Sequence, residues 1–125
     1  MENTYSVILV FKNGLKKIEK NGQYGLLDQK GKEITPCVYD GILNFKNGFA
    51  RVWKKDKQGY INEEGKEIAP CIYDFADNFA HGFALVSKDG VYGYVDETGK
   101  EYFAEDEIKL AERFIKQCEE DEREL

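Results

Sequence analysis

The chain has 125 residues, a length that indicates a single domain. Its formal net charge of −6 argues against direct nucleic-acid binding, because that function needs a basic face. Its hydrophobic content of 42%, with eight tyrosines and eight phenylalanines, is typical of a globular protein with its own core. The longest apolar run, Val7–Phe11, is far shorter than the roughly 18–20 residues that cross a bilayer, so we expect no membrane contact.

The N-terminus and the cysteines predict the compartment. The first residues, M-E-N-T-Y-S, contain an acid where a signal peptide needs basic residues, and the apolar stretch behind them is too short. Three cysteines without close spacing form neither a disulfide framework nor a zinc site. We therefore expect a cytoplasmic protein with reduced, structural thiols and without a metal or cofactor.

A repeated segment dominates the chain. The stretch Asn21–Ile34 returns 34 residues later, ending at Ile68, and once more at the same offset, ending at Tyr102. The register is lost after Phe103, so we divide the chain into a repeat region, 1–103, and a C-terminal segment, 104–125. The repeat region holds a partial repeat and two full repeats. Two glycine series keep the register: Gly25, Gly59, Gly93 and Gly31, Gly65, Gly99.

Each repeat predicts a three-stranded antiparallel meander, because short alternating segments are stopped by glycine turns. In the middle repeat we expect strands over about Phe49–Lys55, Gln58–Asn62 and Lys66–Ala69. Pro70 cannot donate to a central ladder, so the third strand should end before it. The connector 70–79 should then fold over the sheet as a short helical or irregular plug. The expected fold is mainly β, with tandem meanders in a solenoid- or propeller-like array.

Comparison of the repeats separates constant positions from changing ones. On the first strand of each repeat, Ile18, Val52 and Val86 stay apolar, which predicts that they face the core. Their neighbours change freely and should face outward or meet a partner. These changing residues are Lys17, Arg51, Leu85, Glu19, Trp53 and Ser87.

The second strand of each repeat is apolar on both faces and therefore needs cover on both. One face holds Leu27, Ile61 and Val95, and the other holds Leu26, Tyr60 and Tyr94. The pairs Tyr39-Asp40 and Tyr73-Asp74 recur at one position of the repeat. We expect a buried ring in each pair and a carboxylate that caps the turn amides that follow.

The C-terminal segment predicts one amphipathic helix over Ala104–Glu124, which contains no glycine or proline. Segment 104–125 has nine acids and four bases, and therefore accounts for −5 of the net charge. Glu105, Asp106 and Glu107 suit the positive end of the helix dipole. Because its apolar side would otherwise be exposed, the helix should either cap the open end of the repeat array or dock on a second copy as a homodimer.

The segment Y-G-L-L-D-Q-K-G-K-E-I-T-P-C-V-Y-D, followed by F-K-N-G-F-A-R-V, resembles the WG-repeat family, a bacterial-rich class of β-repeat proteins. The resemblance covers Tyr5–Phe103 through the three copies. The tryptophan that names the family is replaced by Tyr24, Gln58 and Tyr92. The resemblance implies a β-meander scaffold used for protein contacts, often attached to other domains. It implies no general enzymatic activity, and no catalytic residue can be carried over.

No motif in the chain predicts catalysis. The single histidine, His81, has the position of a surface turn residue rather than of a base or metal ligand. Asp28 and Asp96 share their position in the repeat with Asn62, and a turn-capping role explains such side chains before a glycine turn. Phosphate loops, nucleophile elbows and metal-ligand spacings are absent from the sequence. We expect a protein that is not an enzyme.

The best candidate for contact with a partner is Trp53, which has Arg51 and Lys55 near it on the changing face. Leu85 takes the position of Arg51 in the next repeat. Tryptophan and arginine concentrate at interaction hot spots. In the alternative interpretation, Trp53 lies under the C-terminal helix or a neighbouring connector.

Two functions fit these observations. The first is a protein-interaction module that uses one sheet face to bind a protein partner of unknown identity. The second is a small inhibitor or immunity-type protein that binds and blocks a toxin or nuclease. An enzyme on a β scaffold is the weakest alternative.

Overall fold

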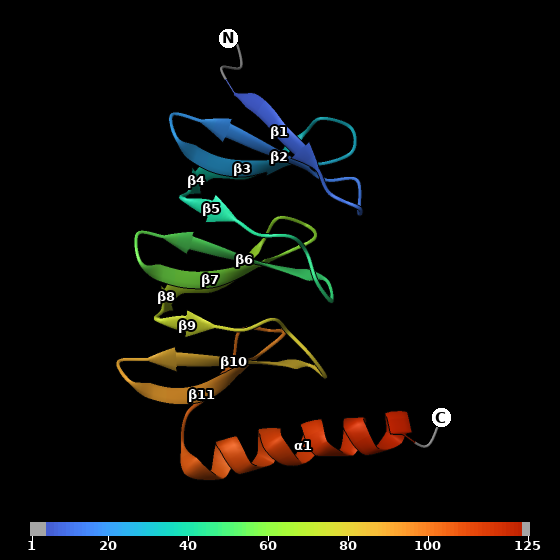
Figure 1. Ribbon diagram of the computed structural model, residues 1–125, viewed down its shortest axis with the longest axis vertical. Coiled ribbons are helices and arrows are strands. Elements are labelled where there is room, and N and C mark those ends of the chain that lie inside the picture. The colour runs from blue at the N-terminus through green and yellow to red at the C-terminus, as the bar shows by residue number, and fades with distance from the viewer. Residues whose placement is uncertain (1–4, 124–125) are drawn as a thin grey trace.

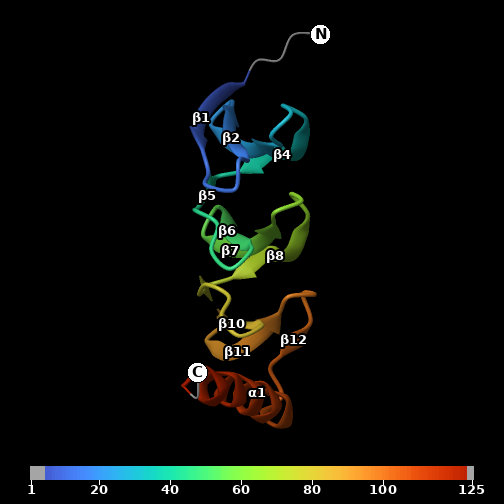
Figure 2. The same ribbon diagram turned by 90° about the vertical axis from the view of Figure 1, so that its right-hand side faces the viewer.

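The computed structural model describes residues 5–123, which form three four-stranded antiparallel sheets in a row and one helix at the end (Figures 1 and 2). The row is open, as in a solenoid, and its two ends lie far apart along the long axis. The predicted mainly β fold, with tandem repeats and one C-terminal helix, is confirmed.

We call the three sheets, with their turns, the first, second and third units. The first sheet has the order β1 (Ser6–Val10), β2 (Lys16–Lys20), β3 (Gln23–Leu27), β4 (Glu33–Tyr39). The second has the order β5 (Gly41–Ile42), β6 (Phe49–Lys54), β7 (Lys57–Asn62), β8 (Glu67–Tyr73). The third consists of β9 (Phe75–Ala76), β10 (Phe83–Lys88), β11 (Val91–Asp96), β12 (Glu101–Tyr102). The helix α1 spans Glu105–Arg123.

The connector between repeats is not the predicted plug. β8 runs through Pro70 to Tyr73, and β9 then pairs with β10 of the next sheet. β8 is an edge strand, and its pairing with β7 shifts register between Gln58 and Tyr60. A proline is tolerated at such a place because its missing N–H interrupts no ladder. The prediction that the third strand ends at Ala69 is wrong, and each sheet has four strands because the connector supplies one.

The glycine before the second-strand core residue is required by close backbone approach. A Cβ atom on Gly59 would lie 2.5 Å from the carbonyl oxygen of Ala69 and 2.7 Å from backbone atoms of Pro70. The equivalent Gly25 faces the Thr35 carbonyl oxygen in the same way, at 2.4 Å. A side chain here would push the second and third strands of the unit apart, which explains why the repeat keeps this glycine.

The core lies within the units and also between them. Ile18, Val52 and Val86 are fully buried, which confirms the prediction from their constancy. Tyr60 and Ile61 are adjacent on β7, yet both are buried. Stacking explains this, because the second unit buries one face of β7 against the first unit and the other against the third.

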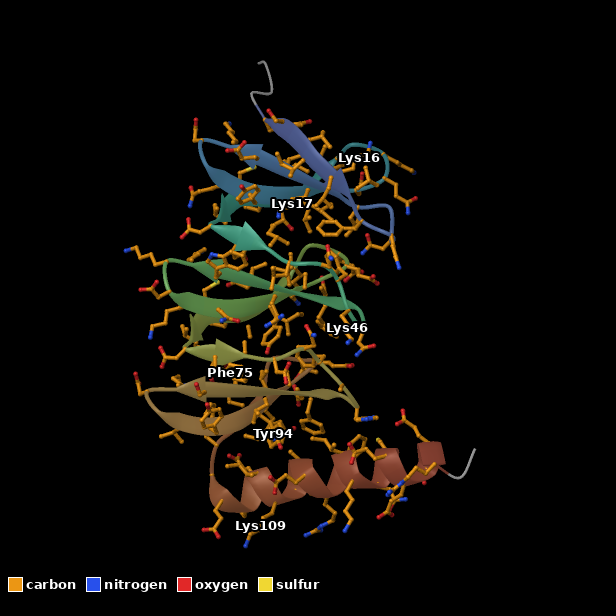
Figure 3. The ribbon with its side chains drawn as sticks, in the orientation of Figure 1. Lys16, Lys17, Lys46, Phe75, Tyr94 and Lys109 are labelled. Carbon is orange, nitrogen blue, oxygen red and sulfur yellow. The ribbon has the colours of Figure 1, made fainter. Side chains whose placement is uncertain are left out.

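Side chains also bond each unit to the next. Lys17 donates to the Ile42 carbonyl at 3.0 Å, and Arg51 donates to the Ala76 carbonyl at 3.0 Å. Figure 3 shows Lys17 between the first two units. Of the changing residues, these two meet the next repeat of their own chain, and Ser87 is buried rather than outward-facing.

A second set of junction bonds comes from the tyrosines. Tyr39 donates its hydroxyl to Glu67 and Tyr73 donates to Glu101, both at 2.5 Å. Tyr60 donates to the Asp77 carbonyl at 2.6 Å. The hydrogen bond from Tyr73 holds the pKa of the Glu101 carboxyl below its ordinary value, with Lys88 adding to the effect. The tyrosine–glutamate pairs therefore tie each unit to the next at one repeating position.

The helix α1 lies across the C-terminal end of the array, against β11 and β12 (Figure 1). Ala111 is fully buried there, and the Phe114 ring packs edge-on against Phe83 with 5.7 Å between ring centroids. Figure 3 shows Tyr94 on the side of the third sheet that faces α1. The helix thus covers the second face of β11, the role that the following unit plays for β7.

Candidate protein-binding site around Trp53

Trp53 lies on β6 directly opposite Gly41 on β5, and its ring covers that glycine. A Cβ atom on Gly41 would come within 2.0 Å of Trp53 Cζ2. In the third unit the sizes are reversed, because Phe75 on β9 faces Ser87 on β10. Each of these two units therefore combines one large and one small residue at this cross-strand pair.

The helix does not cover Trp53. The side chain is half-buried in the second unit, whereas α1 packs on the third unit at the end of the array (Figure 1). Of the alternatives for its cover, the connector is the right one, because β5 belongs to it. One side of the indole packs on this connector, and the remainder faces solvent.

The exposed part of Trp53 contributes to a shallow hollow of about 330 Å³ on the second unit. The hollow brings together three of the four residues predicted to contact a partner. Leu85 lies outside it, on β10 opposite Tyr94 in the third unit. The hollow is lined by Leu43, Arg51, Trp53, Lys55, Asp56 and Gln58.

The frame of the hollow is fixed by hydrogen bonds. The bond to the Ala76 carbonyl orients the Arg51 guanidinium, whose Nε is buried and has no hydrogen-bond partner among residues 5–123. Lys55 stands at the hairpin tip with a φ of 56°, and its backbone N–H donates to the Asp40 carboxylate. The side chain of Lys55 is exposed. The hollow therefore presents an indole, an oriented guanidinium and a solvent-facing ammonium group.

The bonds of Asp40 and Asp74 correct one detail of the sequence analysis. Their carboxylates do not cap the amides that directly follow them but reach the hairpin tip of the next unit, at the N–H groups of Lys55 and Asp89. Asp74 also pairs with Lys57. The rings of Tyr39 and Tyr73 are buried as predicted.

The carboxylates of Asp28 and Asp96, which were weighed as catalytic candidates, instead accept hydrogen bonds from turn amides. Asp28 Oδ1 accepts hydrogen bonds from the backbone N–H groups of Lys30 and Lys32, each at 2.9 Å. Asn62 Oδ1 accepts the equivalent pair at 3.0 Å, and Asp96 does the same in the third unit. The bond from Lys32 holds the pKa of Asp28 below its ordinary value. An amide oxygen performs this role as well as a carboxylate, which explains why Asn62 can replace the aspartate.

His81 is a turn residue, as predicted. It has a φ of 56°, and its Nε2 lies 3.7 Å from a carboxylate oxygen of Glu122 on α1. The cysteines are free and half-buried, and burial raises the pKa of the Cys71 thiol to about 11. Within residues 5–123 no cluster of three or more His, Cys, Asp or Glu side chains is placed to hold a metal. Over the same span, no helix has the length and apolarity to cross a membrane.

The sequence analysis missed one exposed surface, strand β1. All five of its residues are exposed, including the aliphatic side chains of Val7, Ile8, Leu9 and Val10. A signal was present, because Val7–Phe11 is the longest apolar run in the chain and lies in the partial repeat.

Most of the repeat array matches a protein-family model. The model of the WG containing repeat matches residues 24–57 and residues 59–92, which together make up more than half of the chain. No curated protein and no solved structure gave a significant match. The two matches include the close-packed Gly59, the bonds that Tyr39, Tyr60 and Arg51 form between units, and most of the Trp53 hollow. This chain belongs to the WG-repeat family.

Proposed function

We propose that this chain is a non-enzymatic repeat protein that binds another protein through the sheet face containing Trp53. The observation that supports this function most is the hollow in which a half-buried tryptophan stands beside an arginine and a lysine. Partly buried tryptophan and arginine side chains provide much of the binding energy at protein interfaces. The fixed orientation of Arg51 also lowers the entropy that binding would cost.

The chemistry of the hollow suggests the kind of segment that fits. An apolar side chain of the partner would pack on the exposed part of the indole. A neighbouring carboxylate would accept hydrogen bonds from Arg51 and Lys55, because charge-assisted bonds of this kind are short and strong. Asp56 at the rim would disfavour a segment with several acids in a row.

The absence of enzymatic activity is part of the proposal, and it rests on the engagement of the polar side chains. The turn residues Asp28, Asn62 and Asp96 accept backbone N–H groups. Burial raises the pKa of the Tyr60 hydroxyl, which donates to the Asp77 carbonyl. Groups that are occupied in this way hold the fold and are poorly placed to transfer protons to a substrate.

An exchange of the large and small residues of the Trp53–Gly41 pair tests the proposal without leaving a cavity between the two strands. The double variant Gly41→Phe/Trp53→Ser copies the pair that the third unit already has, Phe75 with Ser87, so the fold should persist. The opposite exchange in the third unit, Phe75→Gly/Ser87→Trp, is the matched control because it leaves the hollow intact.

The partner is first identified by co-purification and mass spectrometry from the native cell, and its affinity is then measured by calorimetry. We expect the exchange at Trp53 to weaken binding about tenfold or more, and the control to bind like the natural chain. Equal affinities for both variants would refute the role of the hollow. One stoichiometric toxin or nuclease would indicate the inhibitor, whereas several partners would indicate the interaction module.

A further inference from the structure

The two ends of the array expose apolar side chains of different kinds. At the N-terminal end, Ile8 has the repeat position of Ile42 and Ala76. Ile42 is 2% exposed and Ala76 is fully buried, because each is covered by the preceding unit, whereas Ile8 is 45% exposed. Val10, at the end of β1, is 61% exposed. The surface that β1 exposes is therefore equivalent to the surfaces that are buried between units elsewhere in the array.

The C-terminal end exposes one flank of α1. Leu110 and Phe114 are one turn apart and are 57% and 55% exposed, whereas their neighbour Ala111 is buried against the array. Positions four and seven residues apart extend this flank in both directions. We call it the tail surface, and it consists of Asp106, Leu110, Phe114, Gln117 and Asp121.

The N-terminal surface has the opposite charge. Lys16 lies directly across from Val10 on β2, and Lys12 follows two positions after Val10 in the turn. Figure 3 shows Lys16 beside β1. Among residues 5–123, Glu19 is the acid paired with β1, at the other end of the strand opposite Ser6, and Glu63 of the second unit lines a hollow together with Val10 and Lys12. We call the exposed β1 residues together with Lys12 and Lys16 the head surface.

The charge difference extends beyond these side chains. The first unit, residues 5–39, has six lysines and three acids, a formal charge of +3. The helix α1 has eight acids and four bases, a formal charge of −4. Lys109 is already paired with Glu105 at 3.3 Å, and Arg113 borders the tail surface. Two heads repel one another and two tails repel one another, while a head attracts a tail.

We propose that the head surface binds the tail surface of a second copy of this chain, so that molecules associate head to tail. The two surfaces lie at opposite ends of the long axis, so one molecule cannot join its own head to its own tail (Figure 1). The register shift of β1 at Ile8 disfavours strand pairing between two β1 edges and leaves the side chains as the means of contact. A head-to-tail contact is heterologous, and it therefore extends unless geometry closes a ring. This association uses neither Trp53 nor its hollow.

Sedimentation of the full-length chain tests the proposal. We expect an average mass that rises with protein concentration and falls when salt is added, because screening shortens the range of the attraction. A mass that stays at the monomer value at low salt would overturn the proposal. So would an association that salt leaves unchanged.

Two variants separate the possible arrangements. Val10→Asp places an acid on the head, and Leu110→Gln removes the apolar centre of the tail. Both positions are exposed, and circular dichroism and thermal unfolding verify that each variant is folded. Val91→Gln is the control, since Val91 is 54% exposed in the third unit but belongs to neither surface.

Each variant alone should lose the concentration dependence, and the control should keep it. An equimolar mixture of Val10→Asp and Leu110→Gln should form 1:1 complexes and nothing larger, because only one intact head and one intact tail remain per pair. Self-association of Leu110→Gln alone would indicate head-to-head contact, and self-association of Val10→Asp alone would indicate tail-to-tail contact. Either result, or a mixture that stays monomeric, would overturn the proposal.

Discussion

The junction between the second and third units differs from the junction between the third unit and α1. At the first, Phe79 is buried between Phe49 and Tyr60, with ring centroids 4.4 and 4.8 Å away, and Tyr60 and Arg51 donate to carbonyls of the next unit. At the second, His81 Nε2 lies 3.7 Å from a carboxylate oxygen of Glu122, and the apolar contact leaves Phe114 more than half exposed.

This difference shows that stacking of repeats and capping by a helix are not equivalent. At a repeat junction, the connector strand of the following unit supplies a backbone carbonyl to a side-chain donor of the preceding unit. Ile42 on β5 accepts from Lys17 in this way, and Ala76 on β9 accepts from Arg51. A helix has already used its carbonyls within its own turns, except those of its last turn. Leu85, at the repeat position of Lys17 and Arg51, is apolar, which fits packing against a helix rather than hydrogen bonding to a connector strand. The repeat junctions should therefore determine the stability of the array, and α1 should contribute less.

The largest expected effect is at the repeat junction. Phe79→Ala should lower the free energy of unfolding by about 3–5 kcal/mol, because it leaves a cavity between two rings of the second unit. Urea unfolding followed by circular dichroism measures this. A loss below about 1 kcal/mol would mean that the junction closes around the cavity and is less well packed than the structure shows.

Loss of one junction hydrogen bond should have a smaller effect. Tyr60→Phe removes the donor to the Asp77 carbonyl at a fully buried side chain, and we expect a loss of about 1–2 kcal/mol in the same experiment. Tyr92→Phe is the control, since Tyr92 is 58% exposed, and its stability should be unchanged. Equal stabilities for the two variants would contradict the role given to the Tyr60 hydroxyl.

The tyrosine–glutamate pair predicts a dependence on pH. The pKa of Glu101 is lowered in the folded chain, first by the bond from Tyr73, so its contribution to stability is present above its ordinary value of 4.5 and is lost as the pH falls below it. Glu101→Gln should reduce stability at neutral pH and flatten the acid limb of a plot of unfolding free energy against pH. The effect should be smaller than that of Tyr60→Phe, because Glu101 is partly exposed and solvent screens it. An unchanged acid limb would show that the pair does not contribute.

The smallest expected effect is at the helix junction. Phe114→Ala removes one edge-on ring contact from a side chain that is mostly in solvent, and we expect it to lower the global free energy of unfolding by less than about 1 kcal/mol. Amide exchange should accelerate several-fold in α1 and stay unchanged in β6 and β7, because α1 opens locally. If exchange accelerated equally in all three sheets, α1 would be as important to the array as a repeat.

Much of the fold could be predicted because the same environment occurs three times. Ile18, Val52 and Val86 stay apolar while their neighbours change, and all three are buried. The glycine before the second-strand core residue is constant for a comparable steric reason. Repetition within one chain supplied the contrast that a single copy would have lacked.

The errors arose where tertiary arrangement overrides local preference. Pro70 predicts the end of a strand only if that strand is central, and in this fold it lies on an edge. Lys17 and Arg51 look like surface residues because their acceptors are backbone carbonyls 25 residues away, which no side-chain pattern reveals. The sequence contains a signal for the placement of Trp53. The large and the small residue of its cross-strand pair exchange places between the second unit, with Gly41 and Trp53, and the third unit, with Phe75 and Ser87.

The short reach of the junction bonds has a consequence for how the chain acquires its structure. The bonds from Lys17, Tyr39 and Tyr73 span 25 to 28 positions, and each joins one unit to its neighbour. Contacts so close in sequence need little loop closure and form quickly. During synthesis the first unit can be completed while the third is still inside the ribosome, and each later unit adds to a finished surface. Folding of this chain should therefore proceed in the order of its translation, with α1 docking last.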